Sequence, residues 1–235
     1  MRPVWEDRRV RRGLEAQLEL RRRRLAEGDR PVGWKVAFGA PQAMELLGLD
    51  APLVGFLTSR ALVDPSGSYS IAGWRKPALE AEIAVHIGHD LGAGASREDT
   101  EAAIVGLGPA IELADLDRPL DDLEAVLAEN IFQRGVILGP PDSGRAGGRV
   151  EGIRARTVCD GVELGSTGDP TALTGELVGV IAHVAELLTA FGETLRAGEV
   201  VIAGAVLPHV WPEPGQHVEV EIEPLGRLEI SFEPA

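Results

Sequence analysis

Residues 79–85 read LEAEIAV, and the alternation in this stretch decides how the surrounding chain is expected to fold. Apolar residues recur at every second position from Ile83 to Ile87, which predicts a β-strand with one apolar face. The same alternation places Glu80 and Glu82 side by side on the opposite face. Two neighbouring carboxylates repel each other unless they are solvated, or a cation or shared proton lies between them.

This glutamate pair has two interpretations. An antiparallel strand with one wet face often carries glutamate at alternate positions, and that is the usual explanation. A metal site is the alternative, and it requires a third oxygen ligand elsewhere in the chain. Residues 110–115, AIELAD, contain one. In a strand, Glu112 shares a face with Ala110 and Ala114, whose small side chains leave room for an approaching group.

Glu80, Glu82 and Glu112 together would suit a hard divalent cation, Mg²⁺ or Mn²⁺. Such an ion can hold the carboxylate and the 2-oxo oxygen of a 2-oxo acid and stabilise the enolate that forms beside them. In VGWKVAFG, residues 32–39, Lys35 lies on a further predicted strand. A lone strand lysine is usually solvated, but Lys35 is the natural proton-transfer group if its strand adjoins the carboxylates. Near a divalent cation, burial and like charge would lower its pKa.

The composition restricts the class of protein. The 235 residues are 44% hydrophobic, enough for a sizeable core, and the net charge of −14 argues against a nucleic-acid partner. No apolar run is long enough to span a membrane, and the N-terminal sequence lacks a secretory-type apolar stretch, so a cytoplasmic protein is expected. A single cysteine, Cys159, excludes an intrachain disulfide, and five scattered histidines form no zinc-like cluster.

The overall pattern predicts an α+β protein. An arginine-rich amphipathic helix is expected within residues 1–29, as an appendage to one compact domain at residues 30–235. The clearest helix is predicted to start with Asp169 as N-cap and Pro170 as first helical residue, and to end before Gly192. The remaining C-terminal part reads as strands and turns.

Several stretches of the chain are together typical of one known family. They are VGWKVAFG (32–39), LGLDAPLVGFLT (47–58), PALEAEIAVHIGHDL (77–91), AIELAD (110–115), ENIFQRGVILG (129–139), GDP before the long helix, LRAGEVVIAGAVLP (195–208) and GRLEISF (226–232). From about Arg30 to Phe232 the chain resembles the 2-keto-4-pentenoate hydratase and 4-oxalocrotonate decarboxylase branch of the fumarylacetoacetate hydrolase superfamily. The E-x-E pair followed by A-[IL]-E is the most specific part of the resemblance.

The resemblance implies a mixed β-roll with flanking helices and a homo-oligomer. It implies Mg²⁺ or Mn²⁺ on Glu80, Glu82 and Glu112, and a catalytic Lys35. The implied activity is that of a lyase on a 2-oxo acid or 2-hydroxydienoate from aromatic-compound catabolism, with a 2-keto-4-pentenoate hydratase-like enzyme expected first. The alternatives are an oxo-diacid decarboxylase, a C–C hydrolase of the same superfamily, and a catalytically altered homologue that binds or assembles only.

The chain also departs from the family pattern. Ser59 and Arg60 stand where an acidic residue or two is usual, Phe132 replaces a small or hydroxyl residue, and Leu207 replaces threonine or glycine. An added arginine would favour anionic substrates, and Phe132 would narrow or gate the pocket. In a decarboxylase, Arg60 or Arg134 would hold the second carboxylate. The residues expected to bind substrate are Ser59, Arg60, Asn130, Phe132 and Gly204.

Overall fold

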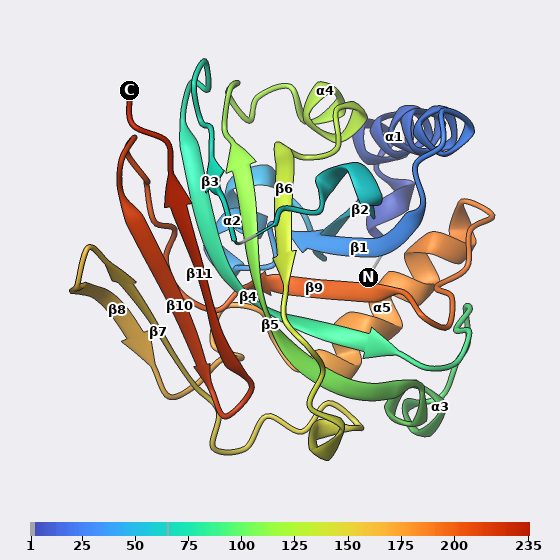
Figure 1. Cartoon of the computed structure of the whole chain (residues 1–235). Helices are drawn as coiled ribbons and strands as arrows, with labels where there is room; N and C mark the ends of the chain where they lie inside the picture. Colours follow the sequence, from blue (N-terminus) through green and yellow to red (C-terminus); the bar gives the residue numbers. More distant parts are fainter. Residues whose placement is uncertain (1–2, 65) are drawn as a thin grey trace.

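The computed structural model describes residues 3–64 and 66–235 and confirms the α+β class: within them, two sheets are flanked by five α-helices (Figure 1). The helices are α1 (Arg8–Ala26), α2 (Pro41–Leu47), α3 (Arg97–Ala103), α4 (Leu123–Ala128) and α5 (Leu177–Ala190), with short 3₁₀ turns η1 (Val4–Glu6), η2 (Ser59–Ala61) and η3 (Ser143–Arg145). Among the described residues, none of the helices has the length and apolar character needed to cross a membrane.

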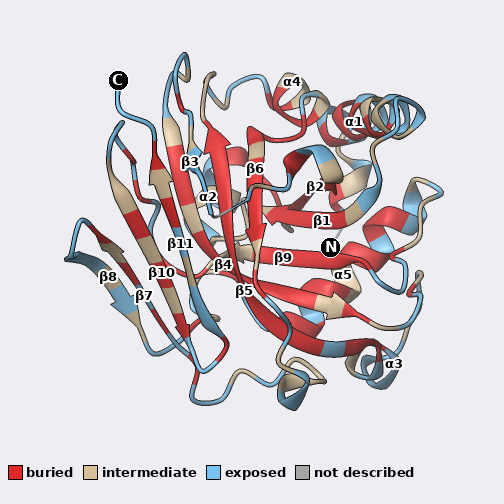
Figure 2. Ribbon diagram, viewed as in Figure 1, coloured by how far each residue is buried: buried red, intermediate tan, exposed pale blue. Residues whose placement is uncertain are grey.

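The two sheets are of different character. The central, six-stranded sheet is mostly buried, whereas the five-stranded sheet beside it has exposed positions along its outer strands (Figure 2). In spatial order the first contains β2 (Leu53–Thr58), β1 (Pro31–Ala37), β9 (Val200–Ala205), β4 (Pro77–Ile87), β5 (Ile104–Asp115) and β6 (Gln133–Leu138). The second contains β3 (Ser68–Tyr69), β11 (Gly226–Phe232), β10 (His217–Glu223), β7 (Arg154–Cys159) and β8 (Val162–Thr167).

The six-stranded sheet curls until its two edges meet. After β2 and η2, Leu62 forms a parallel bridge with Val136 of β6, and the Val63 N–H donates to the Val136 carbonyl at 2.9 Å. The sheet is therefore a nearly closed roll. Its interior is packed by small and branched apolar side chains that alternate with outward-facing ones. These are Leu57, Ala61, Ala84, Ala110, Val136, Val200 and Ile202.

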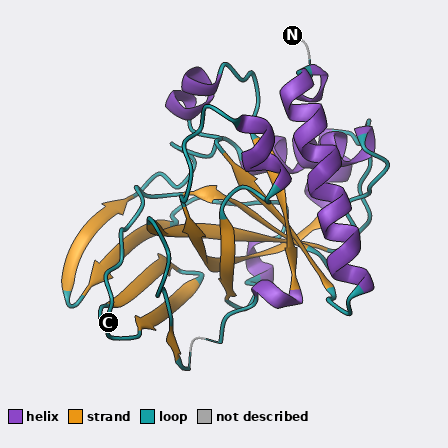
Figure 3. Ribbon diagram, turned by 90° about the horizontal axis from the view of Figure 1, so that it is seen from above, coloured by secondary structure: helices purple, strands orange, loops and turns teal. Residues whose placement is uncertain are grey.

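Helix α1 packs against α4, and the long helix α1, which begins near the N label, runs along one side of the strands (Figure 3). A glycine at position 13 permits this close approach, because a Cβ there would lie 2.6 Å from Leu127 Cβ. The Gln17 side-chain amide donates to the Leu127 carbonyl at 3.0 Å, which adds a polar tie between the helices. Val10 and Leu14 of α1 are buried in the same core as the sheet. The domain boundary between residues 29 and 30 stays a prediction.

Helix α5 starts later than its sequence suggests. Its N-cap is Glu176, whose carboxylate accepts the Gly179 N–H at 3.0 Å, and the expected start at Asp169 and Pro170 is wrong. Asp169 instead caps a local turn by accepting both the N–H and the hydroxyl of Thr171. The chain then passes through positive φ at a glycine, residue 175, before the helix begins. The predicted end before Gly192 is confirmed.

Candidate functional site

Lys35 lies inside the roll and is 3% exposed. Its Nζ donates to the carboxylate of Glu112 and, at 3.1 Å, to the carbonyl of Ile131. Strands β9 and β4 separate β1 from β5 in the sheet, so this side chain spans the interior of the curled sheet. Its neighbour on β2 is Gly55, where a Cβ would lie only 2.9 Å from Lys35 Cγ. The usual expectation of a solvated strand lysine is therefore wrong here.

The three predicted carboxylates come together. Glu80 on β4 is directly opposite Glu112 on β5, and Glu82 lies two residues further along the same face. One oxygen of each carboxylate lies within 4.8 Å of the others. Glu82 and Glu112 are fully buried, while Glu80 is at the edge of the cluster and half-buried. The solvated-strand interpretation of this pair does not hold, because buried carboxylates need partners.

Two oxygens of this cluster have no hydrogen-bond partner among the described residues. Glu82 Oε2 accepts the Gly204 N–H at 2.7 Å, and Gly204 has φ +100°, a conformation that favours glycine. Glu82 Oε1 and Glu112 Oε2 are both buried and unpartnered. Unpartnered buried oxygens are costly and call for a ligand. The donor set, all carboxylate, is one that Mg²⁺, Mn²⁺ and Ca²⁺ accept.

The electrostatics of the cluster reflect its burial. Burial and the Glu112 carboxylate raise the pKa of Glu82 well above its ordinary value. Burial also raises the pKa of Glu112 to about 7, against the opposing effect of the Lys35 ammonium. For Lys35, burial alone favours the neutral amine, but the neighbouring carboxylates outweigh it and its pKa is raised. The expected lowering of this pKa is therefore not found in the metal-free protein.

The raised pKa of Glu112 predicts how the stability of the metal-free protein depends on pH. An unfolded chain has the ordinary value of 4.5, whereas the folded value is about 7. Between these values the folded state binds more protons, so the free energy of unfolding falls as pH rises. The loss due to Glu112 alone is about 3 to 4 kcal/mol, since the two pKa values differ by about 2.5 units and one unit is worth about 1.4 kcal/mol. Thermal unfolding of EDTA-treated protein measures this. A melting temperature that rises with pH through this window would contradict it.

Lys35 and Glu80 line a pocket of about 510 Å³, and Glu82 and Glu112 lie directly behind Glu80 in the carboxylate cluster. Its other polar side chains include Thr174 and His209. The Nε2 atom of His209 lies 3.4 Å from Glu80 Oε1. His209 also packs edge-on against Trp211. The rest of the wall is mainly apolar, and only Phe132 of it was expected from the sequence. It includes Val36, Phe38, Leu116, Leu120, Ile131, Phe132, Leu173, Leu207 and Pro208.

Two of the five expected substrate residues lie elsewhere. The Ser59 hydroxyl accepts the Arg30 N–H at 2.9 Å, and Arg60 pairs with Glu27 and Asp29 at the surface. Neither lines the pocket that contains Lys35. The reason is that η2 turns the chain outward after Thr58, toward the end of the roll where β1 begins. The expected contact of these two residues with substrate is not supported.

The other three expected residues surround the site. Phe132 and Gly204 line the pocket. Asn130 lies behind it: its amide accepts the Phe56 N–H at 2.8 Å and donates to the Phe56 carbonyl at 2.9 Å. Residues 130–132 all have φ between +50° and +68°, which is unusual for non-glycine residues, above all for Ile131. Such strain gathers at functional sites, and here it presents the Ile131 carbonyl to Lys35.

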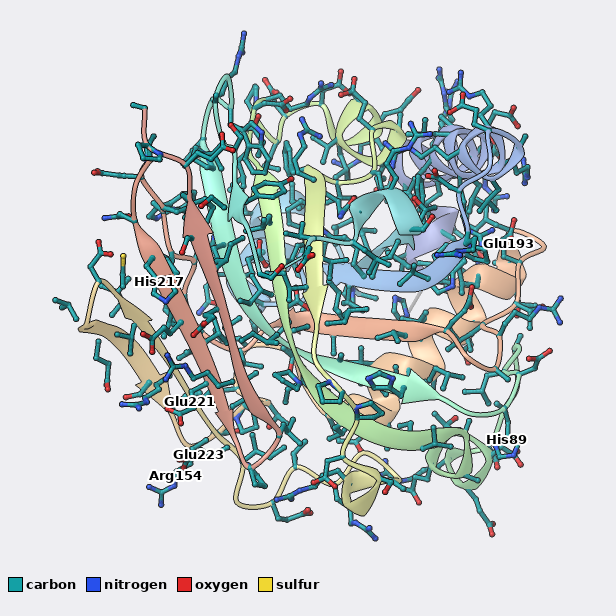
Figure 4. The ribbon with its side chains drawn as sticks, viewed as in Figure 1. His89, Arg154, Glu193, His217, Glu221 and Glu223 are labelled. Atoms are coloured by element: carbon teal, nitrogen blue, oxygen red, sulfur yellow. The ribbon has the colours of Figure 1, made fainter. Side chains whose placement is uncertain are left out.

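A second cavity, of about 570 Å³, lies on the five-stranded sheet. Arg154, Glu221 and Glu223 gather there on β7 and β10 (Figure 4). Glu221 is paired with Arg156 on the neighbouring strand. Opposite charges that neutralise each other at an exposed sheet are a poorer catalytic arrangement than the buried carboxylate cluster. The candidate site is therefore the pocket in the roll.

Comparison with known proteins agrees with this geometry. A family model described as fumarylacetoacetate (FAA) hydrolase C-terminal matches residues 35–233, nearly the whole roll and its second sheet. The chain belongs to the FAA hydrolase family. The match begins at Lys35 and includes all three clustered glutamates. The expected FAA-hydrolase-like fold is thereby confirmed.

Individual relatives place this FAA hydrolase family member more closely. A 4-oxalocrotonate decarboxylase of a Pseudomonas species is 31% identical over 229 residues, 94% of this chain and 86% of the relative. A 2-hydroxyhexa-2,4-dienoate hydratase of Comamonas testosteroni is 29% identical over 222 residues, 92% of this chain and 83% of the relative. The solved 4-oxalocrotonate decarboxylase from Pseudomonas putida G7, complexed with magnesium and adipate, has a TM-score of 0.86 at 25% identity. The aligned region covers 99% of this chain and 90% of the decarboxylase chain.

Proposed function

We propose that this protein is a divalent-metal-dependent lyase that acts on a 2-oxo acid or a 2-hydroxydienoate, in the manner of a 2-keto-4-pentenoate hydratase. The observation that carries the proposal is the cluster of three carboxylates beside Lys35, which meets a pocket through Glu80 and Lys35. The relatives named hydratase and decarboxylase, together with the magnesium of the solved decarboxylase, support it.

Glu80, Glu82 and Glu112 are the residues proposed to hold the cation. Two of their buried oxygens have no partner among the described residues, and the pKa of Glu82 and that of Glu112 are raised as expected for crowded carboxylates. A bound Mg²⁺ or Mn²⁺ supplies positive charge that stabilises the enolate form of a 2-oxo acid. The half-buried Glu80 lines the pocket, so this side of the cluster is the one open to a ligand.

Lys35 is the proposed proton donor and acceptor. Its Nζ is fixed by the Glu112 carboxylate and the Ile131 carbonyl, and its side chain lines the pocket. Its raised pKa means that the metal-free protein holds a proton on Nζ at neutral pH. Hydration of a dienoate adds a proton to one carbon and a hydroxyl group to its neighbour. An ammonium beside the pocket can supply that proton, and the resulting amine can take one back from the attacking water. The apolar wall orients the carbon chain and limits access of bulk water.

The proposal is tested by turnover. Loss of dienoate absorbance from a 2-hydroxydienoate is followed with Mg²⁺ or Mn²⁺ present, beside carbon dioxide release from an oxo-enedioate. We expect hydration to be the faster reaction, and EDTA to abolish it until the metal is restored. If carbon dioxide release is faster, the decarboxylase alternative is correct. A protein inert in both assays with metal bound would leave only the hydrolase or the non-catalytic alternative.

We also propose that the protein is cytoplasmic and assembles as a homo-oligomer. The free, buried thiol of Cys159 fits a reducing compartment. Strand β8 is an edge of the second sheet, and its Val162 and Leu164 are 63% and 53% exposed, so it offers an apolar edge to another copy. We expect light scattering at micromolar concentration to give a multiple of the 25.0 kDa chain mass. A stable monomer would contradict this.

A further inference from the structure

The charges that line the pocket are all at one end of it. Lys35 and Glu80 lie at the base, with His209 beside Glu80. Among the described residues, no other lysine, arginine, aspartate or glutamate lines the cavity. A ligand that places its carboxylate near the base therefore extends its remaining atoms into a region without a fixed counter-charge.

That region is built from hydrocarbon side chains of separate elements. Phe38 follows β1, Leu116 and Leu120 lie between β5 and α4, Phe132 precedes β6, and Leu173 comes from the turns before α5. Phe38 and Phe132 both have positive φ, +57° and +63°, so their positions are set by an unusual backbone and not by strand geometry alone. The wall is assembled from four parts of the chain, which is the arrangement expected of a binding subsite.

The arginines nearest in sequence to this wall are already paired. Arg134 donates to Asp117 at 3.0 Å, and Arg118 pairs with Asp117 and Glu129. Arg60 is held by Asp29 and Glu27 at the surface. None of these guanidinium groups lines the pocket.

Lys76 is also engaged outside the pocket. Its ammonium lies 4.4 Å from the centre of the Trp211 ring, whose edge forms part of the pocket rim. Lys76 is exposed and is not among the residues that line the pocket. Among the described residues, the wall away from Lys35 and Glu80 therefore offers leucine and phenylalanine, and neither lysine nor arginine, to the far end of a ligand.

We propose that this pocket takes a substrate with one carboxylate, held at the base, and a hydrocarbon tail that contacts Phe38, Leu120, Phe132 and Leu173. A second carboxylate at the tail end is disfavoured, because an unpaired charge loses its hydration in an apolar wall. The inference rests on the proposed function and deepens it. Of the two lyase substrates considered, it selects the monoanionic dienoate over the enedioate.

A matched pair of unreactive ligands tests this without turnover. 2-Oxohexanoate and 2-oxoadipate have the same carbon chain and differ in a terminal methyl or carboxylate. Calorimetric titration of the full chain with saturating Mg²⁺ is expected to give 2-oxohexanoate at least about tenfold tighter binding. Equal or tighter binding of 2-oxoadipate, or binding of neither, would overturn the proposal.

A variant makes the test specific for the wall. Leu120→Arg places a cation in the wall on a loop that is partly exposed, and it is expected to shift the affinity ratio toward 2-oxoadipate by about tenfold or more. Leu46→Arg is the matched control, because Leu46 is 74% exposed on α2 and outside the lining, and it should leave the ratio unchanged. An unchanged ratio in Leu120→Arg overturns the proposal. A wild-type protein that prefers 2-oxohexanoate but turns over no dienoate would reject the proposed function and keep the tail preference.

Discussion

Replacing Glu82 by glutamine is expected to weaken Mn²⁺ binding by well over tenfold, each tenfold being about 1.4 kcal/mol. Glu82 is fully buried, and its Oε1 is unpartnered among the described residues, so the amide removes charge from the centre of the cluster. Above neutral pH, the unfolding temperature of the metal-free variant should equal or exceed that of the metal-free wild type. The reason is that the change removes a buried negative charge beside Glu112.

Weaker Mn²⁺ binding together with an unchanged or higher unfolding temperature of the metal-free variant distinguishes a metal ligand from a structural residue. Thermal unfolding with and without Mn²⁺ measures both, and the stabilisation by the ion should nearly vanish in Glu82→Gln. Glu163→Gln is the control, because Glu163 is an exposed carboxylate on β8, and it should leave the effect of the ion intact. Wild-type Mn²⁺ affinity in Glu82→Gln would show that the cluster is not the metal site.

Replacing Lys35 by methionine is expected to lower turnover of a dienoate by roughly 10² to 10⁴-fold, the usual contribution of general acid–base catalysis. Metal affinity should stay close to wild type or increase, since the change removes a positive charge from beside the carboxylates. In the metal-free variant, Glu112 loses its buried partner, and breaking such a pair costs about 3–5 kcal/mol. Added metal should recover part of that loss.

The second lysine of the chain provides the comparison for Lys35. Lys76→Met removes an exposed ammonium near the pocket rim and should change turnover little. Steady-state kinetics and calorimetric metal titration of both variants give the two readouts needed. Turnover of Lys35→Met at the wild-type rate would show that the catalytic role is wrong, whereas lost metal affinity would assign Lys35 to metal binding.

Period-two alternation was sufficient to place the carboxylates. It put Glu80, Glu82 and Glu112 on strand faces that the structure brings within 4.8 Å, because strand geometry is local and side chains alternate regularly. From the sequence, a role for Lys35 could be predicted only on the condition that its strand adjoins the carboxylates. The position of Lys35 inside the roll depends on the curl of a sheet in which β1 and β5 are not neighbours, and no local pattern encodes that curl.

Other features depended on contacts that the sequence does not display. The pKa of Lys35 is raised because three carboxylates surround it, although its burial alone would lower it. Helix α5 begins at Leu177 with Glu176 as its N-cap, because the Asp169 carboxylate accepts the Thr171 N–H in a local turn instead of capping the helix. The hydrocarbon wall around Phe38 and Leu120 comes from loops, whose conformations are set by tertiary packing.

The span of Lys35 across the roll has a consequence for folding kinetics. Its partner Glu112 is 77 residues away in sequence, and Glu82 takes its backbone donor from Gly204, 122 residues away. Contacts this distant in sequence form late, after loop closure has brought the strands together. A metal ion bound to this cluster should therefore slow unfolding strongly while leaving the refolding rate of the chain almost unchanged.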